Sequence, residues 1–180
     1  LKAAYYDPNP VVILEHKGLY WSKVKGTDAA RVNEPSEDYM LPFGKANIVQ
    51  EIWEQETDET ITVITYGMGV HWALNASEKM KNQVEIIDLR TLYPLDEETI
   101  LKSVRKTKKC LVVTEEPTNN SFARSLAGMI QEKCFRDLDA PVMVIGSENM
   151  PAIPLNSILE QTMIPSSDKV KEKIKELLNY

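Results

Sequence analysis

Two adjacent carboxylates are the first feature of this sequence that suggests chemistry. Glu115 and Glu116 follow the mostly apolar run at residues 110–114 (CLVVT), at the predicted carboxyl end of a strand. Open α/β sheets bind their ligands at that edge. Neighbouring side chains in an extended segment point to opposite faces, so we do not expect the two carboxylates to act as an acid–base pair. We expect one of them to be an interface or ligand contact, and Glu115 is the candidate.

The histidines and cysteines are the other residues that could react or bind metal. His16 and His71 have no carboxylate or cysteine partners at metal-ligand spacing, which predicts structural roles rather than catalysis. Cys110 and Cys134 form no C-x-x-C motif, and each lies in an apolar-periodic segment. That setting is typical of reduced, buried thiols, with a disulfide as the alternative.

A Gly67-Met68-Gly69 turn between a predicted strand and helix resembles half of a dinucleotide-binding fingerprint. The third glycine of that motif would fall at Trp72, so the pattern is incomplete, and Asp88 about twenty residues on adds little. A tight strand-to-helix turn is the favoured interpretation. Its backbone amides remain able to receive an anion, as any helix start is. The sequence holds no P-loop, G-x-S-x-G or H-E-x-x-H motif.

Composition narrows the classes of partner. The 180 residues carry a net charge of −6, which argues against nucleic acid as a partner because such binding needs clustered Lys and Arg. The longest apolar runs, such as residues 11–14, have the length of a strand and are too short to span a membrane. The length fits one full domain with a fragment of another attached.

Strands and helices alternate through most of the chain. β-branched or apolar runs predict strands at residues 60–66, 84–89, 110–114 and 142–145. Helical periodicity predicts helices at residues 44–56, 71–80, 121–138 and 168–178, with Asp96 capping another and a further short helix before the last. Such alternation predicts an α/β fold: a three-layer, mostly parallel open sheet with helices on both faces.

The amino-terminal quarter departs from this alternation. It begins as the tail of a helix without an initiator Met, which suggests a fragment, and continues into a predicted strand at residues 11–15 that is buried on both faces. A polar stretch from residue 22 to about 38 lacks periodicity and is typical of a linker. We therefore divide the chain into the tail of a preceding domain (1–21), a linker (22–40) and a carboxy-terminal domain (41–180).

Several segments, in order along the whole chain, resemble the beta subunit of the thiamine-diphosphate-dependent first component of 2-oxo acid dehydrogenase complexes. Residues 84–98 (VEIIDLRTLYPLDEE) are the most specific match. The others are residues 7–12 (DPNPVV), 15–20 (EHKGLY), 41–46 (LPFGKA), 62–67 (TVITYG) with Val70-His71, 138–142 (LDAPV) and Ile164-Pro165. Residues 114–117 (TEEP) and 120–122 (NSF) depart from the family's usual HEAP and GGF. Residues 131–135 lean toward branched-chain relatives.

This resemblance implies a function that the chain does not perform alone. In the family, thiamine diphosphate and Mg²⁺ bind between two other domains, and the carboxylate that activates the thiazolium lies outside this region. The parent enzyme would decarboxylate a 2-oxo acid oxidatively and pass the acyl group to lipoyl-lysine. We therefore assign no catalytic, cofactor-binding or metal-binding residue here and expect the isolated chain to be inactive and without cofactor. A transketolase-type enzyme and a free-standing nucleotide-binding domain are the alternatives.

The resemblance also implies partners. An alpha-type subunit or region, a second copy of the chain and the acyltransferase core component are expected, with neither nucleic acid nor membrane. Glu115, Asp168 and Tyr180 are the candidate interface or docking residues. In a bacterium the protein would be cytoplasmic, and in a eukaryote it would lie in the mitochondrial matrix.

Overall fold

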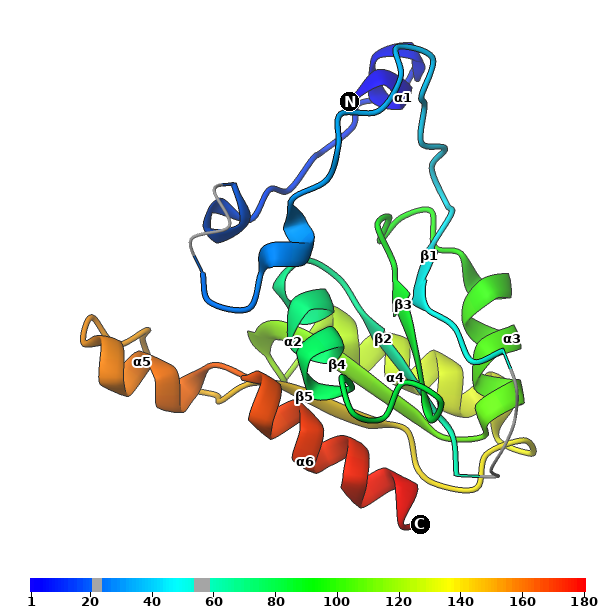
Figure 1. Cartoon of the computed structure of the whole chain (residues 1–180), viewed down its shortest axis with the longest axis vertical. Helices are drawn as coiled ribbons and strands as arrows, with labels where there is room; N and C mark the ends of the chain where they lie inside the picture. The colour runs from blue at the N-terminus through cyan, green and yellow to red at the C-terminus, as the bar shows by residue number, and fades with distance from the viewer. Residues whose placement is uncertain (21–23, 54–58) are drawn as a thin grey trace.

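The computed structural model describes residues 1–20, 24–53 and 59–180, and within them the chain forms a five-stranded sheet (Figure 1). Strands β2 to β5 run parallel, and β1 joins β3 antiparallel at one edge, in the spatial order β1-β3-β2-β4-β5. The predicted mostly parallel sheet is confirmed. The strands are β1 Asn47–Gln50, β2 Ile61–Thr65, β3 Val84–Asp88, β4 Cys110–Pro117 and β5 Met143–Ser147.

Helices surround this sheet and extend to both ends of the chain. They are α1 Lys2–Tyr6, α2 Met68–Ala76, α3 Glu97–Thr107, α4 Phe122–Cys134, α5 Ser157–Met163 and α6 Ser167–Leu178, with short 3-10 turns η1 Lys17–Leu19 and η2 Asp28–Ala30. In the described part of the chain, no helix has the length and apolar character needed to cross a membrane.

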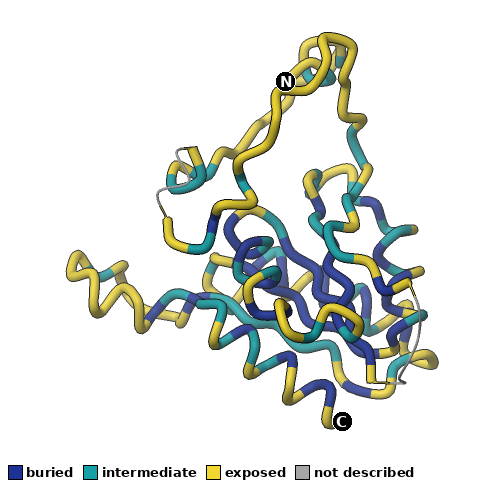
Figure 2. Tube along the Cα trace, viewed as in Figure 1, coloured by how far each residue is buried: buried dark blue, intermediate teal, exposed yellow. Residues whose placement is uncertain are grey.

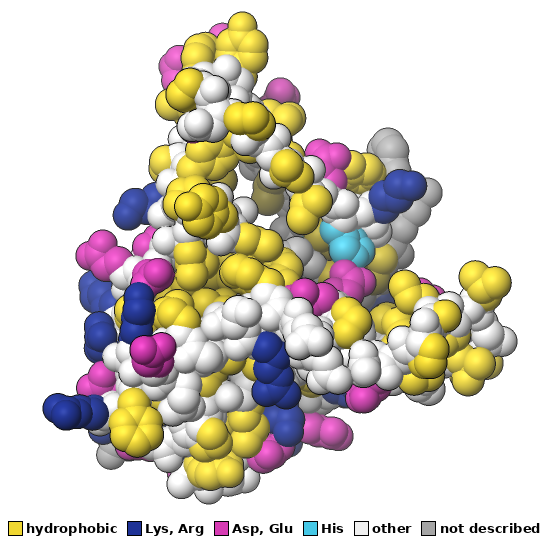
Figure 3. Space-filling model, turned by 180° about the vertical axis from the view of Figure 1, so that it is seen from behind, with side chains coloured by type: hydrophobic (Ala, Val, Ile, Leu, Met, Phe, Trp, Pro, Cys, Tyr) yellow, Lys and Arg dark blue, Asp and Glu magenta, His cyan; other side chains and the backbone are white. Residues whose placement is uncertain are grey.

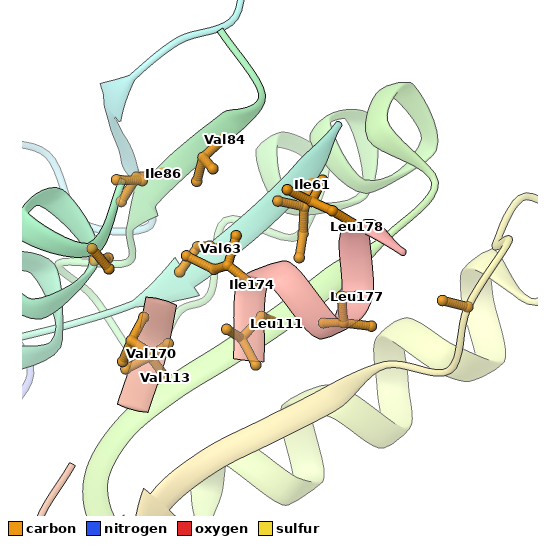
Figure 4. Packing of buried hydrophobic residues seen from close by; sticks show 13 residues of the cluster. Ile61, Val63, Val84, Ile86, Leu111, Val113, Val170, Ile174, Leu177 and Leu178 are labelled. Carbon is orange, nitrogen blue, oxygen red and sulfur yellow. The ribbon is translucent and has the colours of Figure 1, made fainter. Parts of the chain in front are cut away.

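Two hydrophobic clusters, one on each face, hold the helices to the sheet. On one face, α2 and α6 cover Ile61, Val63 and Leu111. Figure 4 shows α6 lying against strands β2 and β4 there. On the other face, α3 and α4 cover a second cluster that includes Ile64 and Val112. Each buried Ile or Leu contributes roughly 1.5–3 kcal/mol by leaving water. Helices on both faces confirm the predicted three layers.

Polar caps fix where several helices begin and end. The Asp96 side chain accepts the Thr99 amide at the start of α3, as the sequence predicts, and Ser121 accepts the Arg124 amide at the start of α4. These bonds satisfy backbone donors that a helix start leaves free. At the carboxyl end of α6, the buried Lys109 amine donates to the Leu178 carbonyl at 2.8 Å. A cation at this end of a helix also interacts favourably with the helix dipole.

The helix predicted over residues 44–56 is wrong. Residues 47–50 form β1, which pairs with β3 so that Ile48 lies opposite Ile87. The Gln50 side chain adds a hydrogen bond to the Val84 carbonyl at 2.7 Å. The backbone groups at the edge of β3 would lack hydrogen-bond partners if residues 47–50 formed a helix. Pairing between β1 and β3 therefore outweighs the helical periodicity of the local sequence. Residues 54–56 of the predicted helix lie outside the described part.

The buried strand predicted at residues 11–15 is also wrong. Its backbone pairs with no strand among the described residues, and the side chains of Val12 and Leu14 are 84% and 83% exposed. The predicted helix tail at the start is present as α1. Among the described residues of 1–43, Thr27 alone is buried, and Figure 2 shows this part of the chain as a mostly exposed extension.

Candidate functional site

The carboxyl ends of β2, β3 and β4 lie side by side, at the edge where parallel sheets bind ligands. Tyr66, which follows β2, brings a hydroxyl to this edge. It lies 2.9 Å from the Thr114 hydroxyl and donates to Glu116 at 3.0 Å. Burial raises the pKa of Tyr66 to about 12, with the Glu116 contact adding to the increase, so the phenol stays protonated as a donor.

Glu116 is a structural acceptor at this edge. Besides Tyr66, its carboxylate accepts the backbone amide of Ala123 in the first turn of α4 at 3.1 Å. The Tyr66 ring packs edge to face against Phe122, with ring centroids 6.0 Å apart. A carboxylate near a helix amino terminus is stabilised by the free amides and the dipole there. Glu116 therefore ties the end of β2 to the start of α4.

Glu115 makes a different contact. Its carboxylate lies 3.0 Å from Nε2 of His16, which comes from the amino-terminal extension. The two neighbouring carboxylates thus bind different groups and do not form an acid–base pair. Glu115 was predicted as a contact to a ligand or partner, and in this structure it contacts residue 16 of its own chain.

The buried His71 and the partly buried Asp88 influence each other electrostatically near this contact. Burial lowers the pKa of His71, Asp88 counteracts this, and His16 lowers it further. Burial raises the pKa of Asp88, which the Arg90 amide and guanidinium partly offset. The Nδ1 atom of His71 is buried without a hydrogen-bond partner among the described residues. Burial at this site therefore disfavours the charged form of the imidazole.

The Gly67-Met68-Gly69 turn has steric reasons for its glycines. Gly67 has a φ of 57°, in the left-handed region. A Cβ on Gly69 would lie 2.0 Å from the Thr65 hydroxyl and 3.4 Å from the Val113 carbonyl. Helix α2 packs closely on the strands because position 69 has no side chain. The left-handed backbone accounts for Gly67 and close packing accounts for Gly69, which fits the favoured interpretation of a tight strand-to-helix turn.

Both cysteines are free and buried, as predicted. They lie in the same hydrophobic cluster as α3 and α4. Burial raises the pKa of the Cys110 thiol far above its ordinary value, and burial also raises that of Cys134. Protonated thiols of this kind are poor nucleophiles.

The other two candidate residues lie on α6 and apart from Glu115. Asp168 is exposed in the first turn of this helix, and Tyr180 lies two residues beyond its last residue, Leu178. A twelve-residue helix is about 18 Å long, so these side chains stand at opposite ends of it. The structure does not bring the three candidates together.

One buried network was missed by sequence reasoning. Glu85 in β3 is 1% exposed, accepts the Ser103 hydroxyl at 2.6 Å and the Ile52 amide at 3.2 Å, and pairs with Lys106. A charged residue inside the apolar run VEIID is the signal that marks it. Its partners all lie within this chain, so the network is structural.

Among the described residues, no cluster of three His, Cys, Asp or Glu side chains can hold a metal ion. The carboxyl edge provides contacts for the chain's own segments. We place no chemical step on it.

Comparison with known proteins identifies the domain. Residues 45–170 match the family described as the transketolase C-terminal domain. The chain belongs to the transketolase C-terminal domain family. The similarity predicted from the sequence is confirmed, because the chain is 39% identical to the 2-oxoisovalerate dehydrogenase subunit beta of Bacillus subtilis (strain 168). That match covers 100% of the chain and 52% of the relative.

Other relatives agree. The pyruvate dehydrogenase E1 component subunit beta of Rhizobium meliloti (strain 1021) is 33% identical over 97% of the chain and 36% of its own length. The chain thus spans about half or less of the relatives it matches. A split-gene transketolase in an inactive beta4 tetramer shares the fold, with a TM-score of 0.61 and 18% identity over 82% of this chain and 46% of that one.

Proposed function

We propose that this chain is the carboxy-terminal assembly domain of the beta chain of a thiamine-diphosphate-dependent 2-oxo acid dehydrogenase. The parent enzyme would decarboxylate a 2-oxo acid oxidatively and transfer the acyl group to lipoyl-lysine. The observation that carries this proposal is the 39% identity to a 2-oxoisovalerate dehydrogenase subunit beta along the entire chain. The transketolase alternative rests on a fold-level likeness at 18% identity, and the incomplete glycine motif does not favour the nucleotide-binding alternative.

We assign residues 1–21 to the end of a preceding domain, residues 22–40 to the connection and residues 41–180 to the carboxy-terminal domain. The exposed apolar run at residues 11–14 supports this division, because four consecutive large apolar side chains without a partner strand are costly in water. A sheet in the preceding domain would cover them.

Thiamine diphosphate and Mg²⁺ would act in the parent enzyme on residues outside this chain. The carboxyl edge supports this assignment, since its carboxylates are already engaged by Tyr66, His16 and Arg90. This chain would contribute scaffold and subunit contacts.

The partners of the domain would be an alpha-type subunit, a second copy of the chain and the acyltransferase core component. Exposed apolar side chains on residues 149–159, which we call the α5 segment, support a protein partner. Figure 3 shows hydrophobic side chains gathered on the projecting α5 segment and along the amino-terminal extension. Glu115, Asp168 and Tyr180 remain the candidate interface or docking residues, with Asp168 and Tyr180 proposed for the acyltransferase. Relatives include bacterial and mitochondrial proteins, so either the cytoplasm or the mitochondrial matrix would be the compartment.

The first experiment is calorimetric titration of this chain with thiamine diphosphate and Mg²⁺. No heat of binding is expected. Binding at micromolar affinity, about −8 kcal/mol, would place a cofactor contact inside these residues and contradict the assignment.

The second experiment measures activity in the longer beta polypeptide that contains this sequence. Mixed with an alpha-type subunit, cofactor and a lipoyl domain, it is expected to acylate the lipoyl group from 2-oxoisovalerate or pyruvate. Ketol transfer between sugar phosphates without lipoyl acylation would favour the transketolase alternative and overturn the proposal.

A further inference from the structure

The chain that precedes the sheet is held to helix α2 at one turn. The Asn75 side chain donates to the Gly26 carbonyl at 2.8 Å. Gly26 has a φ of 82°, in the region that favours glycine, and a Cβ there would lie 2.6 Å from the Asn75 amide nitrogen. The lack of a side chain at position 26 therefore lets the Asn75 amide reach the backbone.

Thr27 completes this turn. It is 1% exposed, in a part of the chain that is otherwise mostly exposed. Its hydroxyl donates to the Val24 carbonyl at 2.6 Å, and its own carbonyl accepts the Ala30 amide at 2.9 Å. A buried hydroxyl that makes its hydrogen bond is typical of well-ordered structure. We call residues 24–30 the anchor.

The anchor is followed by a segment that stands away from the sheet. Residues 31–42 are exposed throughout, and we call them the arm. Apolar side chains of the arm face water, among them Val32, which is 83% exposed, and Met40, which is 54% exposed. The chain returns to the sheet at β1, so the arm projects as a loop between two fixed ends (Figure 1).

The arm runs beside the tail at the start of the chain. The Lys2 amine in α1 donates to the Glu37 carbonyl in the middle of the arm. The tail has exposed apolar side chains of its own at Val12 and Leu14. Single exposed apolar residues are common on proteins, whereas several on adjacent segments mark a contact surface. The tail and the arm therefore fit one partner surface.

We propose that the arm is an interaction surface for the preceding domain of the same polypeptide, and that the anchor presents the arm to that domain. In the proposed division of the chain, the tail is continuous with the preceding domain, so a surface beside the tail faces the same domain. The inference rests on the proposed function in this respect. Fixing both ends of the arm beforehand reduces the conformational entropy that the arm loses when it is covered, so the anchor strengthens the contact.

Hydrogen exchange of this chain and of the longer beta polypeptide tests the arm. Amides of residues 31–42 are expected to exchange at least about tenfold more slowly in the longer polypeptide, because the preceding domain covers them there. Val32→Asp with Met40→Asp should remove most of that protection. Leu155→Asp with Ile158→Asp places the same charges on exposed side chains of the α5 segment. This matched control should leave the protection of the arm unchanged.

Gly26→Ala and Asn75→Ala test the anchor. In this chain each should lower the protection of the Ala30 amide about two- to tenfold, the loss expected for one hydrogen bond. In the longer polypeptide each should also lower the protection of the arm. Asn82→Ala shortens an exposed side chain in the turn between α2 and β3 and should change neither. Unchanged protection of β2 and β4 amides verifies that each variant folds.

Equal exchange of the arm in the two polypeptides overturns the proposal, as does an arm that stays protected in Val32→Asp with Met40→Asp. Protection that appears only at high protein concentration, or only after addition of an alpha-type subunit, would assign the arm to another partner and also overturns it. Arm protection that survives both anchor substitutions would remove the role of the anchor.

These outcomes are separable from the proposed function. A protected arm in a longer polypeptide that shows no 2-oxo acid dehydrogenase activity would contradict the proposed function alone. An active longer polypeptide with an unprotected arm would contradict the interaction surface alone.

Discussion

At the scale of single residues, the buried carboxylate of Glu85 depends on its hydrogen-bond and ion-pair partners. Its carboxylate is buried and satisfied by Ser103, the Ile52 amide and Lys106. A buried carboxylate is tolerated only when such partners are present. Removing the carboxylate leaves those partners without their acceptor and opens a polar void between β1, β3 and α3.

Glu85→Ala is therefore expected to lower the free energy of unfolding by about 3 kcal/mol, measured by urea denaturation. The matched control is Glu97→Ala, which removes a partly exposed carboxylate paired with Lys133 and should cost about 1 kcal/mol or less. Equal effects from the two substitutions would mean that the buried network contributes no more than a surface pair.

Two glycines of this chain should respond in opposite ways to the same substitution. Gly69→Ala places a methyl group 2.0 Å from the Thr65 hydroxyl and should destabilise the fold by about 2 kcal/mol. Gly128→Ala lies in the interior of α4 with no atom within 4 Å of the added carbon, and should stabilise it by about 0.5–1 kcal/mol. Thermal unfolding of both variants checks the pair, and a neutral Gly69→Ala would contradict the close-packing explanation.

At the scale of elements, the cap of α3 predicts a pH dependence. Burial raises the pKa of Asp96, but the amides of Ala46 and Thr99 and the Thr99 hydroxyl outweigh this, so its pKa lies below the ordinary value. A carboxyl whose folded pKa is depressed stabilises the fold above its unfolded pKa of about 4. That stability is lost as the pH falls through the folded value.

Asp96→Ala should cost about 1 kcal/mol at pH 7, and the difference from the unsubstituted chain should shrink below pH 4. Asp96→Asn keeps a capping oxygen without the titrating proton. It should be closer to the unsubstituted chain at pH 7 and should lack the acid-dependent loss. Denaturation curves at pH 7, 5 and 3 decide between these outcomes.

The elements that sequence reasoning predicted correctly are those whose signals are local. Asp96 marked the start of α3, and the buried β-branched runs marked β2, β3 and β4, because capping and parallel-strand burial depend on neighbouring residues. The failures at residues 44–56 and 11–15 depend on distant partners: the edge of β3 in one case and a missing partner strand in the other.

The candidate site shows the same division. That Glu115 and Glu116 act separately was predictable from the alternation of side chains in a strand. That Glu115 meets His16 was not, because nothing local links residues so far apart in the chain. The structural use of Glu116 by Tyr66 and α4 likewise emerges only when the ends of two strands meet.

At the scale of the whole molecule, the chain exposes more surface than its mass explains. A compact monomer of 20.5 kDa exposes about 8,900 Å², whereas this chain exposes 11827 Å². The difference, roughly 3,000 Å², is the size of a large permanent interface. The amino-terminal extension and the projecting α5 segment are the parts of the described chain that stand away from the sheet (Figure 1).

The α5 segment suits contact with a second copy. Residues 149–159 carry no charge, and their exposed apolar side chains are Met150, Ile153, Leu155, Ile158 and Leu159. Across a two-fold axis each residue meets the same surface of its partner, so a charged patch would repel itself. On a chain of net charge −6, we propose this uncharged surface as the one through which two copies would meet without repulsion.

Leu155→Asp with Ile158→Asp should therefore shift the chain from dimer to monomer in sedimentation velocity, raising the dissociation constant at least tenfold. Both side chains are highly exposed, so the fold should survive the change. Val12→Asp with Leu14→Asp is the matched control on the other apolar surface and should leave the dimer intact. A dimer lost only in that control would assign self-association to the extension, and an unsubstituted chain that stays monomeric would leave the α5 surface to an alpha-type subunit.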